Sequence, residues 1–198
     1  MPTDDIQIVR SDDPRCGELE ATGYRVVGES WGARLRLSDT PDLSTLESAV
    51  TRAETAGIVV QELGADFAEA VHELESANNA DYPFTPATAH DLLDRDATVA
   101  LWTSGARIFG ALYGIRLVAV TAISLVDTAA DLDFASVFAA YRGRGIGAAV
   151  TAVGIIAIAA TGVRVFGTGG AAVNAASLGT VRSLGFVIEE QWRSYQRP

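Results

Sequence analysis

One long stretch without charged residues limits what this chain can fold into. From Gly145 to Val163 the sequence contains no Asp, Glu, Lys or Arg, and Ala, Ile, Gly and Val dominate it. Its length is close to that of a membrane-spanning helix. However, Gly, Ala and Thr are more frequent in it than Leu or Phe, and ordinary charged sequence flanks it. We therefore predict a helix buried against a sheet, apolar all round because other elements cover it, and no membrane partner.

The composition excludes several classes of protein. The chain has 198 residues, of which 48% are hydrophobic and 20% charged, which predicts one domain of ordinary size or one domain plus a small appendage. A net charge of −10 argues against a nucleic-acid partner, because polyanions attract a positive surface. Every cationic residue is Arg, so the lysine-dependent Walker phosphate loop is excluded. One Cys and two His predict neither a disulfide nor a metal site, and we expect a cytoplasmic protein.

The hydrophobic patterns predict a mixed α/β (α+β) fold. Strands are expected near residues 6–10 and 24–31, and a helix is expected to begin at Thr40-Pro41 and to end before Gly57. From residue 58 onward the predicted order is strand, helix, helix, three strands, helix, strand, helix and strand. This order indicates a mixed, mostly antiparallel sheet flanked by helices. We divide the chain into an N-terminal extension (1–37), a connecting helix (38–57) and a main domain (58–198).

A faint internal repeat suggests an origin for the extension. Residues 21–27 (Ala-Thr-Gly-Tyr-Arg-Val-Val) match residues 183–188 (Ser-Leu-Gly-Phe-Val-Ile) in character, and Trp31 and Trp192 follow at similar distances. The extension is therefore predicted to be a short β-α-β unit and the remnant of a second half of the same fold. Two unrelated helix–Gly–strand junctions would look the same. Alternatively, the extension forms extra strands that pack on the main domain or on a second subunit in a homodimer.

A glycine-rich loop precedes the uncharged helix. It reads Arg142-Gly143-Arg144-Gly145-Ile146-Gly147, and its amides and arginines suit a phosphate or pyrophosphate at a helix N-terminus. Residues 164–169 have a similar pattern, but there the motif begins inside a strand. The 142–147 copy has a complete predicted strand before it and a long helix after it, so we place the anion site there.

With its context, this loop resembles the acetyl-CoA loop of the GNAT superfamily of N-acetyltransferases. The resemblance covers residues 137–147 (Val-Phe-Ala-Ala-Tyr-Arg-Gly-Arg-Gly-Ile-Gly), and it continues in 174–177 (Asn-Ala-Ala-Ser) and 183–186 (Ser-Leu-Gly-Phe). A Rossmann dinucleotide site is the main alternative, but it would require an acidic residue about 20 residues after the loop. The stretch that follows here is uncharged.

The resemblance implies the GNAT fold, with acetyl-CoA as acyl donor between diverging strands at 130–139 and 164–168. Backbone groups would bind the pantetheine, loop amides the pyrophosphate, and polar side chains of the last helix the thiol end. Asn174 would equally serve as a helix N-cap. The implied cofactor-binding residues are Val137, Phe138, Ala139, Arg142, Gly143, Arg144, Gly145, Ile146, Gly147, Asn174 and Ser177.

The resemblance also suggests catalytic residues, because a carboxylate in the strand before the loop often accepts the amine proton in this family. Asp131 and Asp133 are the candidates, and alternation predicts that they share a face with Ala135 and Val137. The opposite face would carry Leu132, Phe134 and Phe138. Alternatively, both aspartates are solvated residues at a strand start. Many relatives place a Tyr where this chain has Val181, so the usual general acid is in doubt and water could protonate the thiolate.

These features lead to an acetyl-CoA-dependent N-acetyltransferase that transfers acetyl to a primary amine of a small molecule or protein. A non-catalytic acyl-CoA-binding sensor of the same fold is the alternative, and a structural domain without a ligand is the third possibility. Residues 141–198 carry six Arg and two Glu, a net of +4, whereas the rest of the chain is acidic. The acceptor region should therefore be negative, with Asp81, Tyr82 and Asp94 as contacts for a cationic amine.

Overall fold

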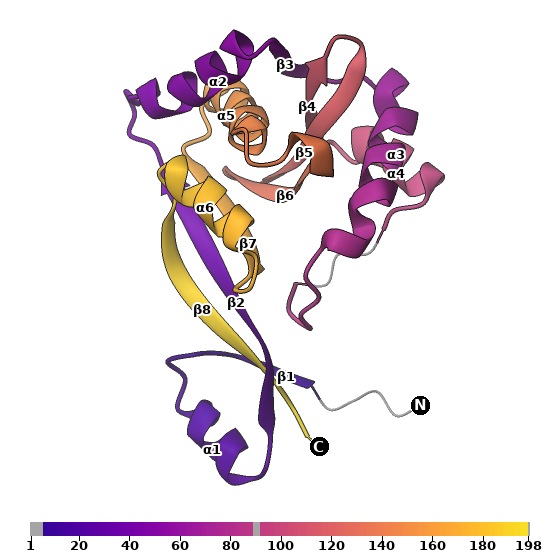
Figure 1. The fold of residues 1–198 in the computed structure, drawn as a ribbon. Helices are drawn as coiled ribbons and strands as arrows, with labels where there is room; N and C mark the ends of the chain where they lie inside the picture. The colour runs from indigo at the N-terminus through magenta and orange to yellow at the C-terminus, as the bar shows by residue number, and fades with distance from the viewer. Residues whose placement is uncertain (1–5, 89–91, 198) are drawn as a thin grey trace.

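A computed structural model describes residues 6–88 and 92–197 as one eight-stranded sheet with helices on both faces (Figure 1). The strand order is β1-β8-β2-β7-β6-β5-β4-β3. The strands are β1 (Ile6–Arg10), β2 (Arg25–Arg36), β3 (Ile58–Glu62), β4 (Arg107–Tyr113), β5 (Arg116–Val126), β6 (Ala129–Val137), β7 (Val165–Ala171) and β8 (Val187–Gln196). The helices are α1 (Arg15–Ala21), α2 (Ser44–Thr55), α3 (Ala68–Asn78), α4 (Arg95–Thr103), α5 (Ile146–Ala159) and α6 (Ala175–Ser183), with single 3-10 turns η1 (Ala65–Phe67), η2 (Asn79–Asp81) and η3 (Ala139–Tyr141).

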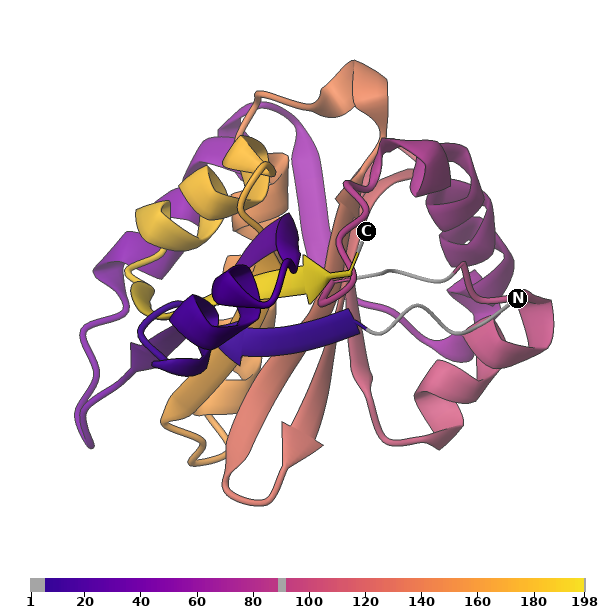
Figure 2. The ribbon, with the colours of Figure 1, turned by 90° about the horizontal axis from the view of Figure 1, so that it is seen from below.

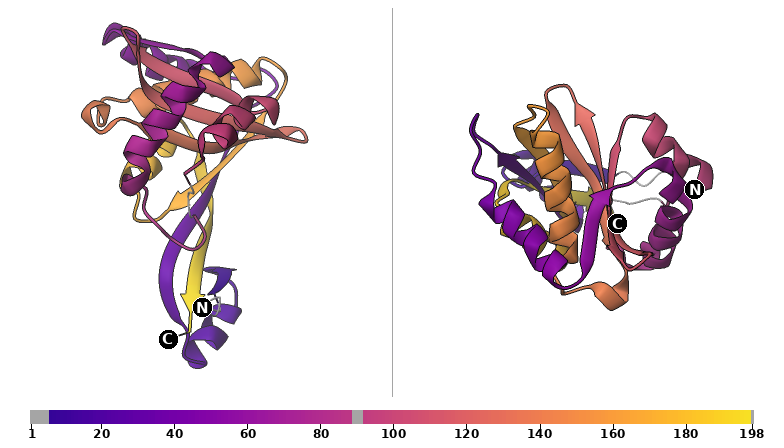
Figure 3. Two further views of the ribbon diagram at one scale, coloured as in Figure 1. Left: turned by 90° about the vertical axis from the view of Figure 1, so that its right-hand side faces the viewer. Right: turned by 90° about the horizontal axis from the view of Figure 1, so that it is seen from above.

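Two hydrophobic clusters lie on opposite faces of the sheet. Helices α2, α5 and α6 contribute to the larger cluster, and α3 and α4 contribute to the other. The view along the sheet in Figure 3 (right) shows these two helical layers on either side of the strands. The predicted mixed, mostly antiparallel sheet flanked by helices is confirmed, and so is the predicted order of elements from residue 58 onward.

Helix α5 confirms the prediction made from the uncharged stretch. It is buried along most of its length, including Ala149, Ile155 and Ile158, which have no exposed surface. Gly154 lets it approach the sheet closely, because a Cβ there would lie 2.6 Å from Cδ1 of Ile123. None of the described helices is long and apolar enough to cross a bilayer.

Several boundaries differ from the prediction for local reasons. Helix α2 begins at Ser44 rather than at Thr40-Pro41, and a side-chain oxygen of Asp42 accepts the N–H of Ser44 at 2.9 Å. Strand β2 continues to Arg36, because both of its edges are paired, one by β7 and the other by β8.

Strands β6 and β7 are the only parallel neighbours described, and they pair briefly. Their register contains two positions, Ala130 with Phe166 and Asp131 with Gly167. Every other pair of neighbouring strands is antiparallel. Beyond Asp131 the two strands diverge, which leaves backbone groups of β6 open toward β7.

A β-bulge in β6 overturns part of the predicted face assignment. Leu132 pairs with Ile123 and Phe134 with Ala122, so Asp133 is an extra residue in the ladder. Leu132 packs in the cluster with α5, whereas Phe134 packs in the cluster with α3. The prediction that Leu132 and Phe134 share a face, and that Asp133 shares one with Val137, was therefore wrong, because the inserted residue resets the alternation.

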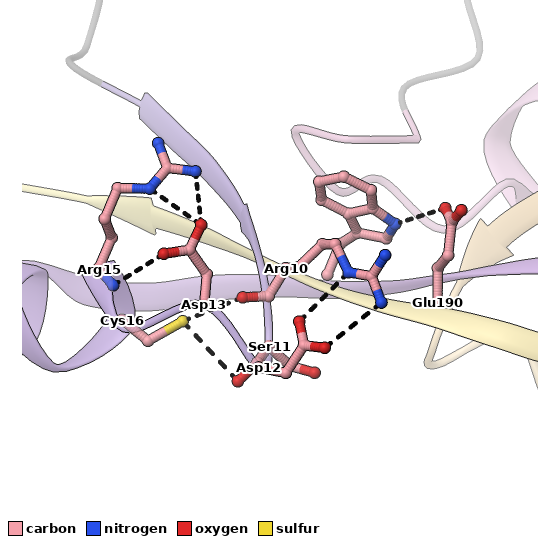
Figure 4. A network of polar contacts seen from close by, with 8 residues as sticks. Arg10, Ser11, Asp12, Asp13, Arg15, Cys16 and Glu190 are labelled. Atoms are coloured by element: carbon pink, nitrogen blue, oxygen red, sulfur yellow. Dashed lines mark hydrogen bonds and ion pairs between the residues drawn. The ribbon is translucent and has the colours of Figure 1, made fainter.

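The N-terminal extension forms a protruding arm. Strands β2 and β8 run together beyond the main body and carry β1 and α1 at their far end (Figures 1 and 3, left). Figure 2 shows this end from below, with α1 on one side of the strands. A separate small cluster holds it, built from Val9, Cys16, Tyr24 and Tyr195. Ion pairs Arg10–Asp12 and Arg15–Asp13 fix the turn between β1 and α1 (Figure 4).

The β1–α1–β2 unit follows the same local path as β7–α6–β8. Both helices end before a glycine of positive φ, Gly23 and Gly185. The N–H of the residue after the glycine then donates to the carbonyl five positions earlier. Tyr24 donates to Leu19 O at 3.0 Å, and Phe186 donates to Val181 O at 3.1 Å. Strands β2 and β8 pair with each other. In addition, β2 pairs with β7 and β8 pairs with β1, so each last strand also pairs with the first strand of the other unit. The predicted β-α-β extension is confirmed; its origin as a remnant half stays a prediction.

Candidate functional site

A cleft of about 780 Å³ opens where β6 and β7 diverge. One wall comes from β6 and the segment after α3, the other from β7 and α6, and the first turn of α5 closes the inner end. Its lining includes Asn78, Asp81, Tyr82, Asp133, Ser136, Val137, Arg142, Gly143, Gly145, Ile146, Gly147, Thr168, Asn174, Ser177 and Val181. The cleft thus brings together most of the residues predicted to form the site.

The glycine-rich loop presents backbone amides to this cleft. Gly143 and Gly145 have φ of 74° and 76°, a conformation that favours glycine. Gly145 is the N-cap of α5, and no side chain caps the helix. The first N–H groups of a 14-residue helix therefore remain available beside the cleft. Together with the helix dipole, they make a suitable site for an anion.

Gly147 provides space between α5 and β6. A Cβ at this position would lie 3.3 Å from Cγ2 of Val137, so a larger residue would push the helix from the strand. Both residues line the cleft. Close contact at this point keeps the helix N-terminus against the open edge of β6.

The two loop arginines have different surroundings. Arg142 lines the cleft, but its guanidinium bonds to Val137 O, to Asn78 and to Asp81. Arg144 is exposed, and its guanidinium carbon lies 5.4 Å from the ring centroid of Tyr141. The structure describes no hydrogen bond or ion pair of Arg144 with another residue of 6–88 or 92–197. Arg144 is therefore the loop arginine with donors to spare.

The predicted backbone contacts after β6 are partly occupied by protein groups. The N–H of Phe138 bonds to Val118 O at 3.0 Å, and its ring packs in the cluster with α3. Ala139 begins η3 and is exposed outside the cleft lining. Among the three predicted residues, Val137 alone lines the cleft.

The two predicted catalytic aspartates have different surroundings. Asp133 lines the cleft and accepts a 2.6 Å hydrogen bond from Ser124 Oγ. Partial burial raises the pKa of the Asp133 carboxyl, Ser124 opposes this shift, and the nearby Asp131 charge adds to it. Asp131 instead lies against β7, where its Oδ1 fills the space that a Cβ of Gly167 would occupy. Of the two aspartates, Asp133 is therefore the one that lines the cleft.

On the other wall, α6 starts with a side-chain cap. Oδ1 of Asn174 accepts the N–H of Ser177 at 3.0 Å, so Asn174 has the capping role that was the alternative to cofactor contact. Both residues still line the cleft. Val181 also lines it and is buried. The α6 wall therefore carries no phenol at the position where many relatives have one.

A buried polar group on the α3 wall was missed by sequence reasoning. Asn78 and Ser136 are 3% and 4% exposed, and Asn78 Nδ2 donates to Ser136 Oγ at 2.8 Å. The Tyr82 hydroxyl lies 3.4 Å from both carboxylate oxygens of Glu75. Burial and the Glu75 charge raise the pKa of Tyr82. No sequence motif marks Asn78 or Ser136, because the two residues pair across 58 positions of the chain.

The predicted acceptor contacts have mixed outcomes. Asp81 and Tyr82 line the cleft. Asp94 instead caps α4 by accepting the N–H of Ala97 at 2.8 Å, and it lies outside the cleft lining. Of the two histidines, His72 lies outside the cleft lining with its Nδ1 3.1 Å from Leu93 O, and His90 falls outside the described residues.

The fold was then compared with known proteins. Neither family models nor curated sequences gave a match. A GCN5-related N-acetyltransferase from Sphaerobacter thermophilus superposes with a TM-score of 0.75 at 16% identity, over 98% of this chain and 60% of that one. The chain has the GNAT fold. A GNAT acetyltransferase from Colwellia psychrerythraea matches with a TM-score of 0.65 at 16% identity, covering 96% of this chain and 64% of the other.

A shorter protein shares the GNAT fold as well. The ribosomal-protein-S18-alanine N-acetyltransferase from Escherichia coli matches with a TM-score of 0.56 at 17% identity. This match covers 71% of the present chain and 93% of the other. By contrast, the present chain spans less than two thirds of the length of the Sphaerobacter and Colwellia proteins.

Proposed function

We propose that this protein is an acetyl-CoA-dependent N-acetyltransferase acting on a primary amine. The observation that carries the proposal is the uncapped N-terminus of α5, set beside the open edge of β6 in one cleft. Loop amides and Arg144 would bind the pyrophosphate, and the gap between β6 and β7 would take the pantetheine. The described residues fit this donor, because the cleft combines an anion site with an unpaired strand edge.

The amine would enter from the α3 side of the cleft, which Tyr82 and Asp133 line. The amine nitrogen attacks the thioester carbonyl and loses a proton to Asp133, directly or through water. The carbon–sulfur bond then breaks, and the thiolate takes a proton from solvent. Because Val181 stands where many relatives have a Tyr, water is the proton source we favour.

Binding of acetyl-CoA to a Gly145→Glu variant tests the proposal. The added carboxylate would occupy the anion site, so calorimetric affinity should fall at least tenfold. Gly162→Glu is a matched control, because Gly162 also has positive φ and open surroundings but lies beyond the other end of α5. Equal affinity of the two variants would reject the loop as the binding site.

A non-catalytic acyl-CoA sensor is the second candidate, and the buried Val181 favours it. Release of free thiol from acetyl-CoA, measured across a panel of primary amines, separates the two. An enzyme releases thiol in proportion to an acetylated amine. A sensor binds acetyl-CoA and releases none above background.

A further inference from the structure

Arg142 connects three parts of the cleft. Its Nε donates to Val137 O at 2.9 Å, and its Nη2 donates to Asn78 Oδ1 at 2.8 Å. Its Nη1 lies 2.7 Å from Asp81 Oδ2. These contacts join the end of β6, the last turn of α3 and the η2 turn. One planar guanidinium thus holds the loop and the α3 wall in a fixed relation.

Asn78 makes this connection specific. The residue is 3% exposed, and both polar atoms of its side-chain amide are hydrogen-bonded. Nδ2 donates to Ser136 Oγ, and Oδ1 accepts from Arg142 Nη2. If Arg142 were removed, the buried Asn78 Oδ1 would lose this charged donor, and that loss would destabilise the folded state. Both side chains of the ion pair with Asp81 are about half exposed. This pair therefore orients the guanidinium and contributes little to stability.

We propose that Arg142 is a positioning residue that fixes the acceptor wall (Asn78 to Tyr82) to β6, and not a pyrophosphate ligand. Its donors already face protein acceptors in three directions, so contact with phosphate would require the Asp81 pair to open. Arg144, whose donors are spare, is the arginine left for the pyrophosphate. The role toward the acceptor rests on the proposed function, whereas the fixing of the wall does not.

The test compares Arg142→Ala and Asp81→Asn with Arg144→Ala. In the free protein, hydrogen exchange of the amides of residues 78–82 should accelerate at least tenfold in Arg142→Ala and about two- to fivefold in Asp81→Asn, which removes only the half-exposed ion pair. In the same two variants the acetyl-CoA Kd should change less than about threefold. Arg144→Ala should do the opposite, weakening acetyl-CoA about tenfold and leaving the exchange unchanged.

Turnover with the best amine of the panel gives a third measurement. Arg142→Ala and Asp81→Asn should raise the KM for the amine and leave the KM for acetyl-CoA unchanged, a split that general loss of structure would not produce. The proposal is overturned if Arg142→Ala weakens acetyl-CoA tenfold while exchange stays at the wild-type rate. If Arg142→Ala does not fold, Asp81→Asn decides by the same measures. Failure of the wild type to bind acetyl-CoA would reject the proposed function, and the exchange data would still decide whether Arg142 fixes the wall.

Discussion

One inserted residue in β6 decides which face of the sheet Asp133 takes. Without the bulge, strict alternation would continue along β6 and would give Asp133 and Val137 the same face. The bulge instead aims Asp133 at Ser124 and the cleft. Partial burial raises the pKa of its carboxyl, so its carboxylate is a stronger base than that of an ordinary aspartate.

Asp133→Asn should lower turnover by about 10² to 10⁴, the usual contribution of a general base. The raised pKa means that the native state disfavours the ionised Asp133 carboxylate. This charge therefore lowers the free energy of unfolding at pH values above the folded-state pKa, and it has no such effect below the pKa of the unfolded chain. The melting temperature at neutral pH should therefore not fall in this variant. Activity loss together with a large drop in melting temperature would assign Asp133 a structural role.

Ser124→Ala tests the same base through the pH profile. Ser124 donates to the ionised form and so lowers the Asp133 pKa. Removal of the Ser124 hydroxyl should raise the pKa of Asp133. The acid limb of kcat/KM should then move to higher pH, because the Asp133 carboxyl loses its proton only at higher pH. A profile identical to that of the wild type would mean that Asp133 does not govern this limb.

Strand β2 of the extension supports the loop that follows α3. A Cβ on Gly28 would lie 3.0 Å from Thr85 Cβ and 3.2 Å from Pro86 Cδ, and Thr85 is buried. The neighbouring Pro83 and Thr88 line the cleft. The extension therefore packs against the loop that follows the acceptor wall, although the two are far apart in the sequence.

Gly28→Val should displace this loop at a cost of about 1–3 kcal/mol. Chymotryptic cleavage next to Phe84, already 76% exposed, should then accelerate while acetyl-CoA affinity is unchanged. Gly28→Ala should have a smaller effect, because a single methyl group needs less movement. Equal cleavage rates in all three proteins would show that Gly28 does not support the loop.

Elements with strong local signals could be predicted from the sequence. The three consecutive strands predicted after the two helices are present as β4, β5 and β6, and α5 has the predicted burial. The motif at 142–147 identified the loop, because glycines of positive φ are required there. The position of β2 between β7 and β8 could not be predicted, since it depends on pairing between the two ends of the chain. The role of Arg142 depends likewise on partners, Asn78 and Asp81, that a motif does not show.

Two bodies of unequal size share the long strands β2 and β8. The main body has its clusters on either side of the sheet, whereas the arm has one small cluster around Tyr195. Tyr195 is fully buried, and its hydroxyl donates to Glu20 at 2.9 Å. The cleft lies in the main body. Loosening of the arm end should therefore leave the anion site intact.

Tyr195→Ala tests this separation. Loss of a buried aromatic side chain costs about 3–5 kcal/mol, more than so small a cluster can absorb. Hydrogen exchange in α1 and β1 should therefore accelerate strongly, while exchange in α5 and the acetyl-CoA Kd stay near wild-type values. Ile155→Ala, a cavity in the centre of α5, should instead lower global stability by about 2–5 kcal/mol. If Tyr195→Ala accelerates exchange in α5 as much as in α1, the paired strands β2 and β8 couple both bodies into one cooperative unit, and the extension would then contribute to the stability of the main body.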